Sequence, residues 1–115
     1  MSHFITLLEA KTLTADHRAN REKVLDAQYQ GIDMLPLCET FNRADIDLIL
    51  GQSGCESLRI YYGMDTNMKI HAVIVGVNGQ NEDMIPANEN TANEQIAEKS
   101  IRCPTSCPPA SALNQ

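Results

Sequence analysis

The stretch KIHAVIVGVNG, residues 69–79, constrains the fold of this 115-residue chain more than any other. Its apolar side chains alternate onto both faces of an extended strand: Ile70, Ala72 and Ile74 on one face, and Val73, Val75 and Val77 on the other. A strand that is apolar on both faces is typical of the centre of a covered sheet. We therefore predict a sheet built around this segment, with a hairpin turn at residues 78–79.

The flanking segments supply neighbours for this strand. Residues 57–63 alternate with a period of two and predict a second strand, and residues 82–86 predict a third, shorter one that ends at Pro86. Residues 87–95 are polar and predict a loop. Residues 95–103 fit either an edge strand or one helical turn. The pattern indicates an antiparallel meander of three to four strands.

Two helices are expected before the sheet. Thr6 followed by Glu9 predicts a capping box, and a helix should cover much of residues 7–28, with a break near residues 12–14 and a stop at Gly31. A second helix should begin near residue 42 and end at residue 51. The expected fold is α+β, with two N-terminal helices followed by the meander. We expect a single domain over residues 1–101 and a Pro/Cys-rich tail over residues 102–115.

The second apolar face of the central strand needs a cover. A chain of this length has few elements left to supply one, so Val73, Val75 and Val77 are candidate interface residues in a homodimer or larger homo-oligomer. The alternative is that the N-terminal helix wraps around and covers this face. The sequence leaves both possibilities open.

The charge balance bears on partners and location. Nine Lys and Arg residues stand against fifteen Asp and Glu, for a formal net charge of -6, with no basic stripe. This balance disfavours nucleic-acid partners and adhesion to an anionic membrane. The sequence shows no secretory signal and no apolar run long enough to span a bilayer. We expect a cytoplasmic protein with reduced cysteines, unless two of them act in catalysis or bind a metal.

The C-terminal segment RCPTSCPP raises the question of a cofactor. Three residues separate Cys103 from Cys107, where a zinc knuckle and a thioredoxin-like site usually have two. A zinc site would need Cys55 or a histidine such as His71 or His17 as further ligands. A disulfide between Cys103 and Cys107 is another possibility, and a proline-stiffened tail that docks on the surface or on a neighbouring subunit is the simplest.

Two further candidate sites involve the predicted sheet. Cys55 could act as a nucleophile if His71 lay beside it as a base, or it could be a buried thiol without chemistry. Arg59, Tyr61 and His71 could line a small pocket for an anionic ligand, or they could form a solvated sheet face.

The segments LPLCETFNRADIDLIL, QSGCESLRIYYGMD, HAVIVGVNGQNEDMI and RCPTSCPP, taken in this order, resemble a group of small uncharacterised proteins from Bacteroidetes-type bacteria. The resemblance covers about residues 31–109, and its most specific parts are GCESLRIYYG and the terminal cysteine pair. The resemblance implies one compact unit that includes the tail. It implies no activity.

No nucleotide-binding, hydrolase or metalloprotease motif is present in the sequence. The leading hypothesis is therefore a non-enzymatic cytoplasmic module that oligomerises or binds a protein partner. The alternatives are a thiol or zinc site at the cysteine pair, and a binder of small anions.

Overall fold

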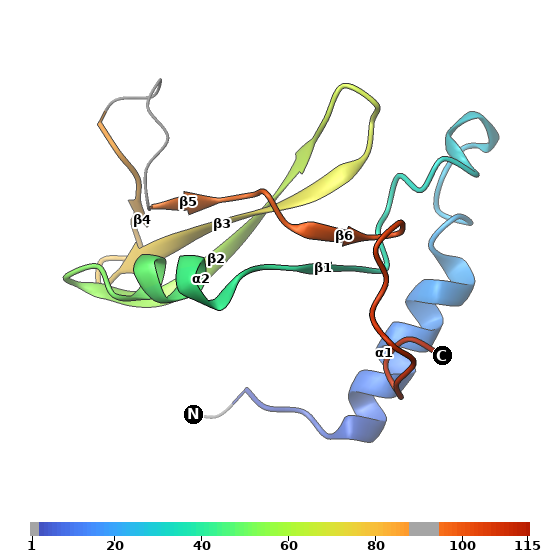
Figure 1. Cartoon of the computed structure of the whole chain (residues 1–115), viewed down its shortest axis with the longest axis horizontal. Helices are drawn as coiled ribbons and strands as arrows, with labels where there is room; N and C mark the ends of the chain where they lie inside the picture. The colour runs from blue at the N-terminus through green and yellow to red at the C-terminus, as the bar shows by residue number, and fades with distance from the viewer. Residues whose placement is uncertain (1–2, 88–94) are drawn as a thin grey trace. The chain divides into compact units, whose positions relative to one another are not determined.

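The computed structural model describes residues 3–87 and 95–115 and has an α+β fold (Figure 1). The chain divides into two compact units, which are described separately. Unit 1 consists of residues 1–38 and 102–115, and unit 2 consists of residues 39–101. This grouping differs from the expected single domain over residues 1–101, because residues 102–115 form one unit with the N-terminal segment.

Unit 1 begins with helix α1, Leu7–Asn20, which starts as predicted. The Thr6 hydroxyl accepts the Glu9 N–H at 3.1 Å, and the Glu9 carboxylate accepts the Thr6 N–H at 3.4 Å. The expected break near residues 12–14 is wrong. The helix continues through Thr12 and Thr14 because their hydroxyls donate to backbone oxygens of the preceding turn, which keeps these residues compatible with a helix.

The end of α1 also differs from the expectation. The helix stops at Asn20, and a short 3-10 helix, Ala27–Tyr29, precedes Gly31, whose φ of 77° places it in a turn. Arg21 explains the early stop, since its guanidinium donates to the Leu35 backbone oxygen and approaches the Asp33 carboxylate at 3.4 Å. No helix in the described part of the chain is long and apolar enough to cross a membrane.

Unit 2 contains helix α2, Arg43–Leu50, and a four-stranded antiparallel sheet. Its strands are β2 Cys55–Met64, β3 Ile70–Asn78, β4 Asp83–Met84 and β5 Ile96–Ala97. Strand β3 lies at the centre, as predicted. It pairs with β2 along one edge and with β4 and β5 along the other. Figure 1 shows β2 and β3 as the long pair of the sheet.

The predicted simple meander is wrong. Strand β5 returns to the central strand, and a separate two-stranded sheet pairs β1, Cys38–Thr40, with β6, Ile101–Cys103. Because β1 precedes α2, the two helices do not both come before the first strand. Residues 96–97 and 101–103 are strands, which decides between strand and helix for residues 95–103. Most of the loop predicted at residues 87–95 lies outside the described residues.

The core of unit 2 lies between α2 and one face of the sheet. Ile49 of α2 is 1% exposed, and Ile74 of β3 is buried on the covered face. Gly76 makes this close approach possible, because a Cβ at that position would lie 2.9 Å from Cys55 Sγ and 3.4 Å from Ile49 Cγ2. The helix therefore rests on the sheet where the sheet has no side chain.

The opposite face of β3 carries two buried valines. Val75 and Val77 are 3% and 4% exposed. Arg59 lies opposite Val75 on β2, Asp83 lies opposite Val77 on β4, and the two charged side chains meet at 2.6 Å. Residues directly opposite each other point to the same face. The Arg59–Asp83 pair therefore spans Val75 and Val77, two of the three valines predicted for an interface. The third, Val73, lies opposite Tyr61 and is half-buried.

The contact under α2 predicts an effect of adding one methyl group. We expect Gly76→Ala to lower the free energy of unfolding by about 1–3 kcal/mol, since the new Cβ must displace the Cys55 sulfur. Gly63→Ala is the matched control in β2. Its Cβ would make only an ordinary 3.4 Å contact with Val73 Cγ2. Urea unfolding of both variants checks the prediction, which fails if they lose equal stability.

Candidate functional site

Strand β2 has an outer edge that pairs with no strand among the described residues. The Asp65 N–H donates to the Lys69 oxygen, so the odd-numbered residues of β2 form hydrogen bonds with β3. The Asn78 N–H donates to the Glu82 oxygen, so the even-numbered residues of β3 form their hydrogen bonds on the side away from β2. In an antiparallel pair this alternation holds along the whole strand. The N–H and C=O groups of Leu58, Ile60 and Tyr62 therefore point to the edge that no strand occupies in the described part of the chain.

The same even-numbered residues expose apolar side chains. We call them the edge strip: Leu58, Ile60, Tyr62 and Met64. Tyr62 is 79% exposed and Ile60 is 49% exposed. They point to the face on which α2 lies, because Leu58 is opposite Gly76. A long, apolar, unpaired edge strand is a template for pairing with another chain, and monomeric proteins usually blunt such edges.

The other face of β2 carries a polar cluster. Asp83 accepts a hydrogen bond from Tyr61 Oη at 2.5 Å and one from Arg59 Nη1 at 2.6 Å. Arg59 Nη2 also donates to the Asn81 side chain. The hydrogen bond from Tyr61, followed by the one from Arg59, holds the pKa of the Asp83 carboxyl below its ordinary value. The same hydrogen bond to Asp83 raises the pKa of Tyr61.

His71 lies among carboxylates instead. Its Nε2 is 2.7 Å from Asp65 Oδ2, and its Nδ1 is 3.2 Å from Glu98 Oε1 and 3.6 Å from Glu39 Oε1. Glu39 also accepts the Ala72 N–H at 2.8 Å. The hydrogen bond with His71 is the main cause that lowers the pKa of Asp65. This cluster holds the start of β3 in place.

The predicted anion pocket of Arg59, Tyr61 and His71 is brought together only in part. Arg59 and Tyr61 meet at Asp83, whereas His71 bonds to Asp65. Arg59 and His71 already have carboxylate partners, so these three residues do not converge on an open anion site. Sequence reasoning missed the two aspartates. Asp83 lies on β4, with β3 between it and Arg59, and Asp65 lies in the turn before β3, so only the pairing of the strands brings them to these partners.

The proposed Cys55–His71 pair is wrong. Cys55 lies opposite Asn78 at one end of the β2–β3 pair, and His71 lies opposite Gly63 near the other end. The Cys55 thiol donates to the Ser57 backbone oxygen at 3.4 Å. The register therefore separates the thiol from the imidazole that would serve as its base.

Cys103 and Cys107 form a disulfide in unit 1. The expectation of reduced cysteines is wrong for these two, whereas Cys38 and Cys55 are free. Zinc would need the two bridged sulfurs as ligands, together with Cys55 or His71 from unit 2. No group of three His, Cys, Asp or Glu side chains in residues 3–87 and 95–115 is arranged to hold a metal ion.

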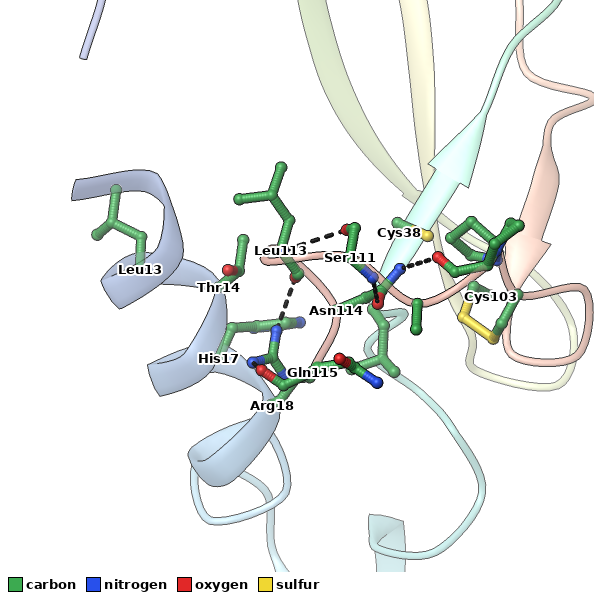
Figure 2. Close-up of a pocket in the computed structure, with 15 residues that line it drawn as sticks. Leu13, Thr14, His17, Arg18, Cys38, Cys103, Ser111, Leu113, Asn114 and Gln115 are labelled. Atoms are coloured by element: carbon green, nitrogen blue, oxygen red, sulfur yellow. Dashed lines mark hydrogen bonds between the residues drawn. A yellow bond between two sulfur atoms is a disulfide. The ribbon is translucent and has the colours of Figure 1, made fainter. Parts of the chain in front are cut away.

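A pocket of about 820 Å³ lies beside this disulfide, within unit 1 (Figure 2). One wall is formed by α1, through Leu13, His17 and Arg18, and the other by the C-terminal residues 107–115. Arg18 donates to the Leu113 backbone oxygen at 2.7 Å, and His17 Nε2 is 2.7 Å from the Pro36 oxygen. The tail is therefore an ordered wall of unit 1.

No protein-family model matches the chain. No curated protein and no solved structure matches it either. The resemblance to the Bacteroidetes-type group therefore stays a prediction, and function has to be argued from the geometry.

The Asp83 cluster predicts a pH effect on stability. Because the pKa of Asp83 is lowered in the folded state, the unfolded chain takes up this proton first as the pH falls. The stabilisation is therefore complete above the ordinary carboxyl pKa and is lost as the pH falls through the lowered one. Tyr61→Phe removes the largest cause, so the Asp83 carboxyl should titrate at higher pH in this variant. Side-chain NMR titration measures the shift, and an unchanged titration contradicts the assignment.

Proposed function

We propose that this protein is a self-associating interaction module whose contact surface is the free edge of β2 together with the edge strip. The observation that carries the proposal is the coincidence of two features on the same residues. Leu58, Ile60 and Tyr62 present backbone groups that no strand of residues 3–87 and 95–115 pairs with, and they expose apolar side chains on the sheet face. The first partner we assign is a second copy of this chain.

Symmetry narrows the way in which two copies can pair. Two β2 strands related by a two-fold axis perpendicular to the sheet run antiparallel, and the α2 face of one copy continues into the α2 face of the other. Each side chain therefore lies opposite a side chain on the same face of the joined sheet. The register centred on Ile60 places Ile60 opposite itself and Leu58 opposite Tyr62. The N–H and C=O groups of these three residues all point to the outer edge of β2. Residues that lie opposite each other in this register therefore exchange hydrogen bonds between the two copies.

Charge favours this register over its neighbour. When Ile60 is at the centre, Arg59 lies opposite Tyr61 and Glu56 lies opposite Met64, so no like charges meet across the strands. A register centred on Arg59 would place two guanidinium groups side by side, which is destabilising. The formal net charge of -6 on each copy adds a general repulsion, which salt screens.

The energetics point to a reversible contact. The Ile60-centred register forms on the order of six backbone hydrogen bonds, each worth about 0.5–1.5 kcal/mol net, and buries the edge strip from both copies. Association costs several kcal/mol of rotational and translational freedom. A dissociation constant of roughly micromolar order is therefore expected.

Other interaction partners and a cytoplasmic location stay predictions.

Cysteine cross-linking tests both the contact and its register. In a background that carries Cys38→Ser and Cys55→Ser, Ile60→Cys should form an intermolecular disulfide under mild oxidation, because the two Cα atoms would lie about 5.5 Å apart. Tyr62→Cys is the matched control. Its copy would lie roughly 14 Å away along the paired strands, beyond the reach of a disulfide.

Non-reducing electrophoresis of the two variants gives the result. Equal cross-linking of Ile60→Cys and Tyr62→Cys would contradict the register, and no cross-linking of either at about 100 µM would contradict the contact. Sedimentation adds an independent check. Ile60→Lys should shift the protein to monomer, whereas Leu8→Lys, at an exposed leucine of α1, should leave its association unchanged.

A further inference from the structure

We propose that the pocket of unit 1 is a thiol–disulfide exchange site, in which a small thiol with an apolar body binds next to the Cys103–Cys107 disulfide and attacks Cys107. The proposal concerns unit 1 alone and does not depend on self-association through β2. It rests on three properties of the pocket: its apolar lining, the charge of its lining and the unequal exposure of the two bridged cysteines.

The lining selects an apolar ligand. Six of the lining residues are aliphatic or proline: Leu13, Leu37, Pro108, Pro109, Ala110 and Leu113. The volume of about 820 Å³ falls in the range of ordinary small-molecule sites, which are mostly apolar with a few polar groups. Figure 2 shows Leu13 and Leu113 on facing walls, from α1 and from the tail.

The charge of the lining selects a ligand that reacts as an anion. No lining side chain is acidic, although the chain as a whole carries fifteen Asp and Glu residues against nine Lys and Arg. Two lining residues, His17 and Arg18, can carry positive charge. The terminal residue Gln115 also lines the pocket, and its oxygen accepts a hydrogen bond from Arg18 Nη2. The attacking form of a thiol is its thiolate, so a lining without acidic side chains favours the reactive species.

The two cysteines of the bridge differ in exposure, which gives the exchange a direction. Cys103 is 3% exposed and its backbone oxygen accepts the Leu37 N–H at 2.8 Å, whereas Cys107 is exposed. Cys107 is therefore the more accessible of the two cysteines for an incoming thiolate. Cys103 belongs to the leaving side of the reaction and stays anchored in β6.

The step balances without an added oxidant. The ligand thiol gives its proton to solvent, and its thiolate attacks Cys107 Sγ. The Cys103–Cys107 bond breaks as a bond forms between the ligand sulfur and Cys107. Cys103 leaves as a thiolate and takes a proton from solvent. One disulfide is consumed and one is formed, so the exchange is reversible, and attack by Cys103 on the mixed disulfide restores the starting state.

A comparison of two thiols of similar acidity tests the proposal. The oxidised protein, in the Cys38→Ser and Cys55→Ser background, is exposed to benzyl mercaptan or to 2-mercaptoethanol, and the opened bridge is trapped with a maleimide and counted by mass spectrometry. The measured quantity is the ratio of the rate constant for benzyl mercaptan to the rate constant for 2-mercaptoethanol. This ratio should be about tenfold higher in the folded protein than in the same protein unfolded in guanidinium, because only the folded protein has the pocket. An equal ratio in both states overturns the proposal.

Two variants of α1 locate the effect. Leu13→Glu places a carboxylate in the pocket and should reduce the folded ratio to the unfolded one. Leu8→Glu makes the same change at an exposed leucine outside the lining and should leave the ratio unchanged. If both variants behave alike, the pocket is not the site. Should Leu13→Glu fail to fold by circular dichroism, Leu113→Glu on the facing wall takes its place.

Peptide mapping of the trapped product tests the direction. The expected species carries the benzylthio group on Cys107 and the maleimide on Cys103. The reverse labelling would contradict the assignment of Cys107 as the attacked sulfur.

Discussion

The alternation of hydrogen bonds between β2 and β3 is the constraint on which the rest of unit 2 depends. The odd-numbered residues of β2 bond to β3, so the even-numbered residues present their backbone groups to the other edge, where the described residues place no strand. The same alternation assigns side chains to faces. Leu58, Ile60 and Tyr62 share the face of α2, and Arg59 and Tyr61 share the face of the polar cluster. A shift by one residue would reverse every one of these assignments.

Carboxylates hold this register at two places. Asp83 ties β4 to β2 across the central strand through Arg59 and Tyr61. Glu39, which is close to buried, accepts the Ala72 N–H and the Ser100 hydroxyl. Two of the acidic side chains of the chain, Asp83 and Glu39, therefore have a structural role. Val75 and Val77 are buried, whereas the four side chains of the β2 edge strip are exposed.

Much of the fold follows from local sequence patterns. The capping box at Thr6, the second helix after Asn42, the central strand and the hairpin at residues 78–79 all depend on near neighbours, and the structure contains each of them. The end of α1 could not be predicted from local sequence patterns, because Arg21 bonds to Leu35 and Asp33, and this contact forms only in the tertiary structure. The return of β5 to β3 is another long-range choice that periodicity does not encode.

The candidate sites were harder to predict for the same reason. The sequence identified Arg59, Tyr61 and His71 as chemically interesting, but it gave no means of pairing them with Asp83 and Asp65. The spacing of Cys103 and Cys107 excluded the common zinc and redox motifs and left the disulfide as one option among several. The pocket beside the disulfide depends on residues 107–115 returning to α1, which a proline-rich segment does not reveal by pattern.

The central claim is that the free edge of β2 pairs with a second copy of the chain. Amide hydrogen exchange at Leu58, Ile60 and Tyr62, followed as a function of protein concentration, tests it most directly, since these N–H groups are open to water in the monomer and bonded in the dimer. We expect the exchange of these three amides to slow as the protein concentration rises through the micromolar range, while the exchange rates of the Arg59 and Tyr61 amides change much less. Exchange at Leu58, Ile60 and Tyr62 that does not depend on concentration would contradict it.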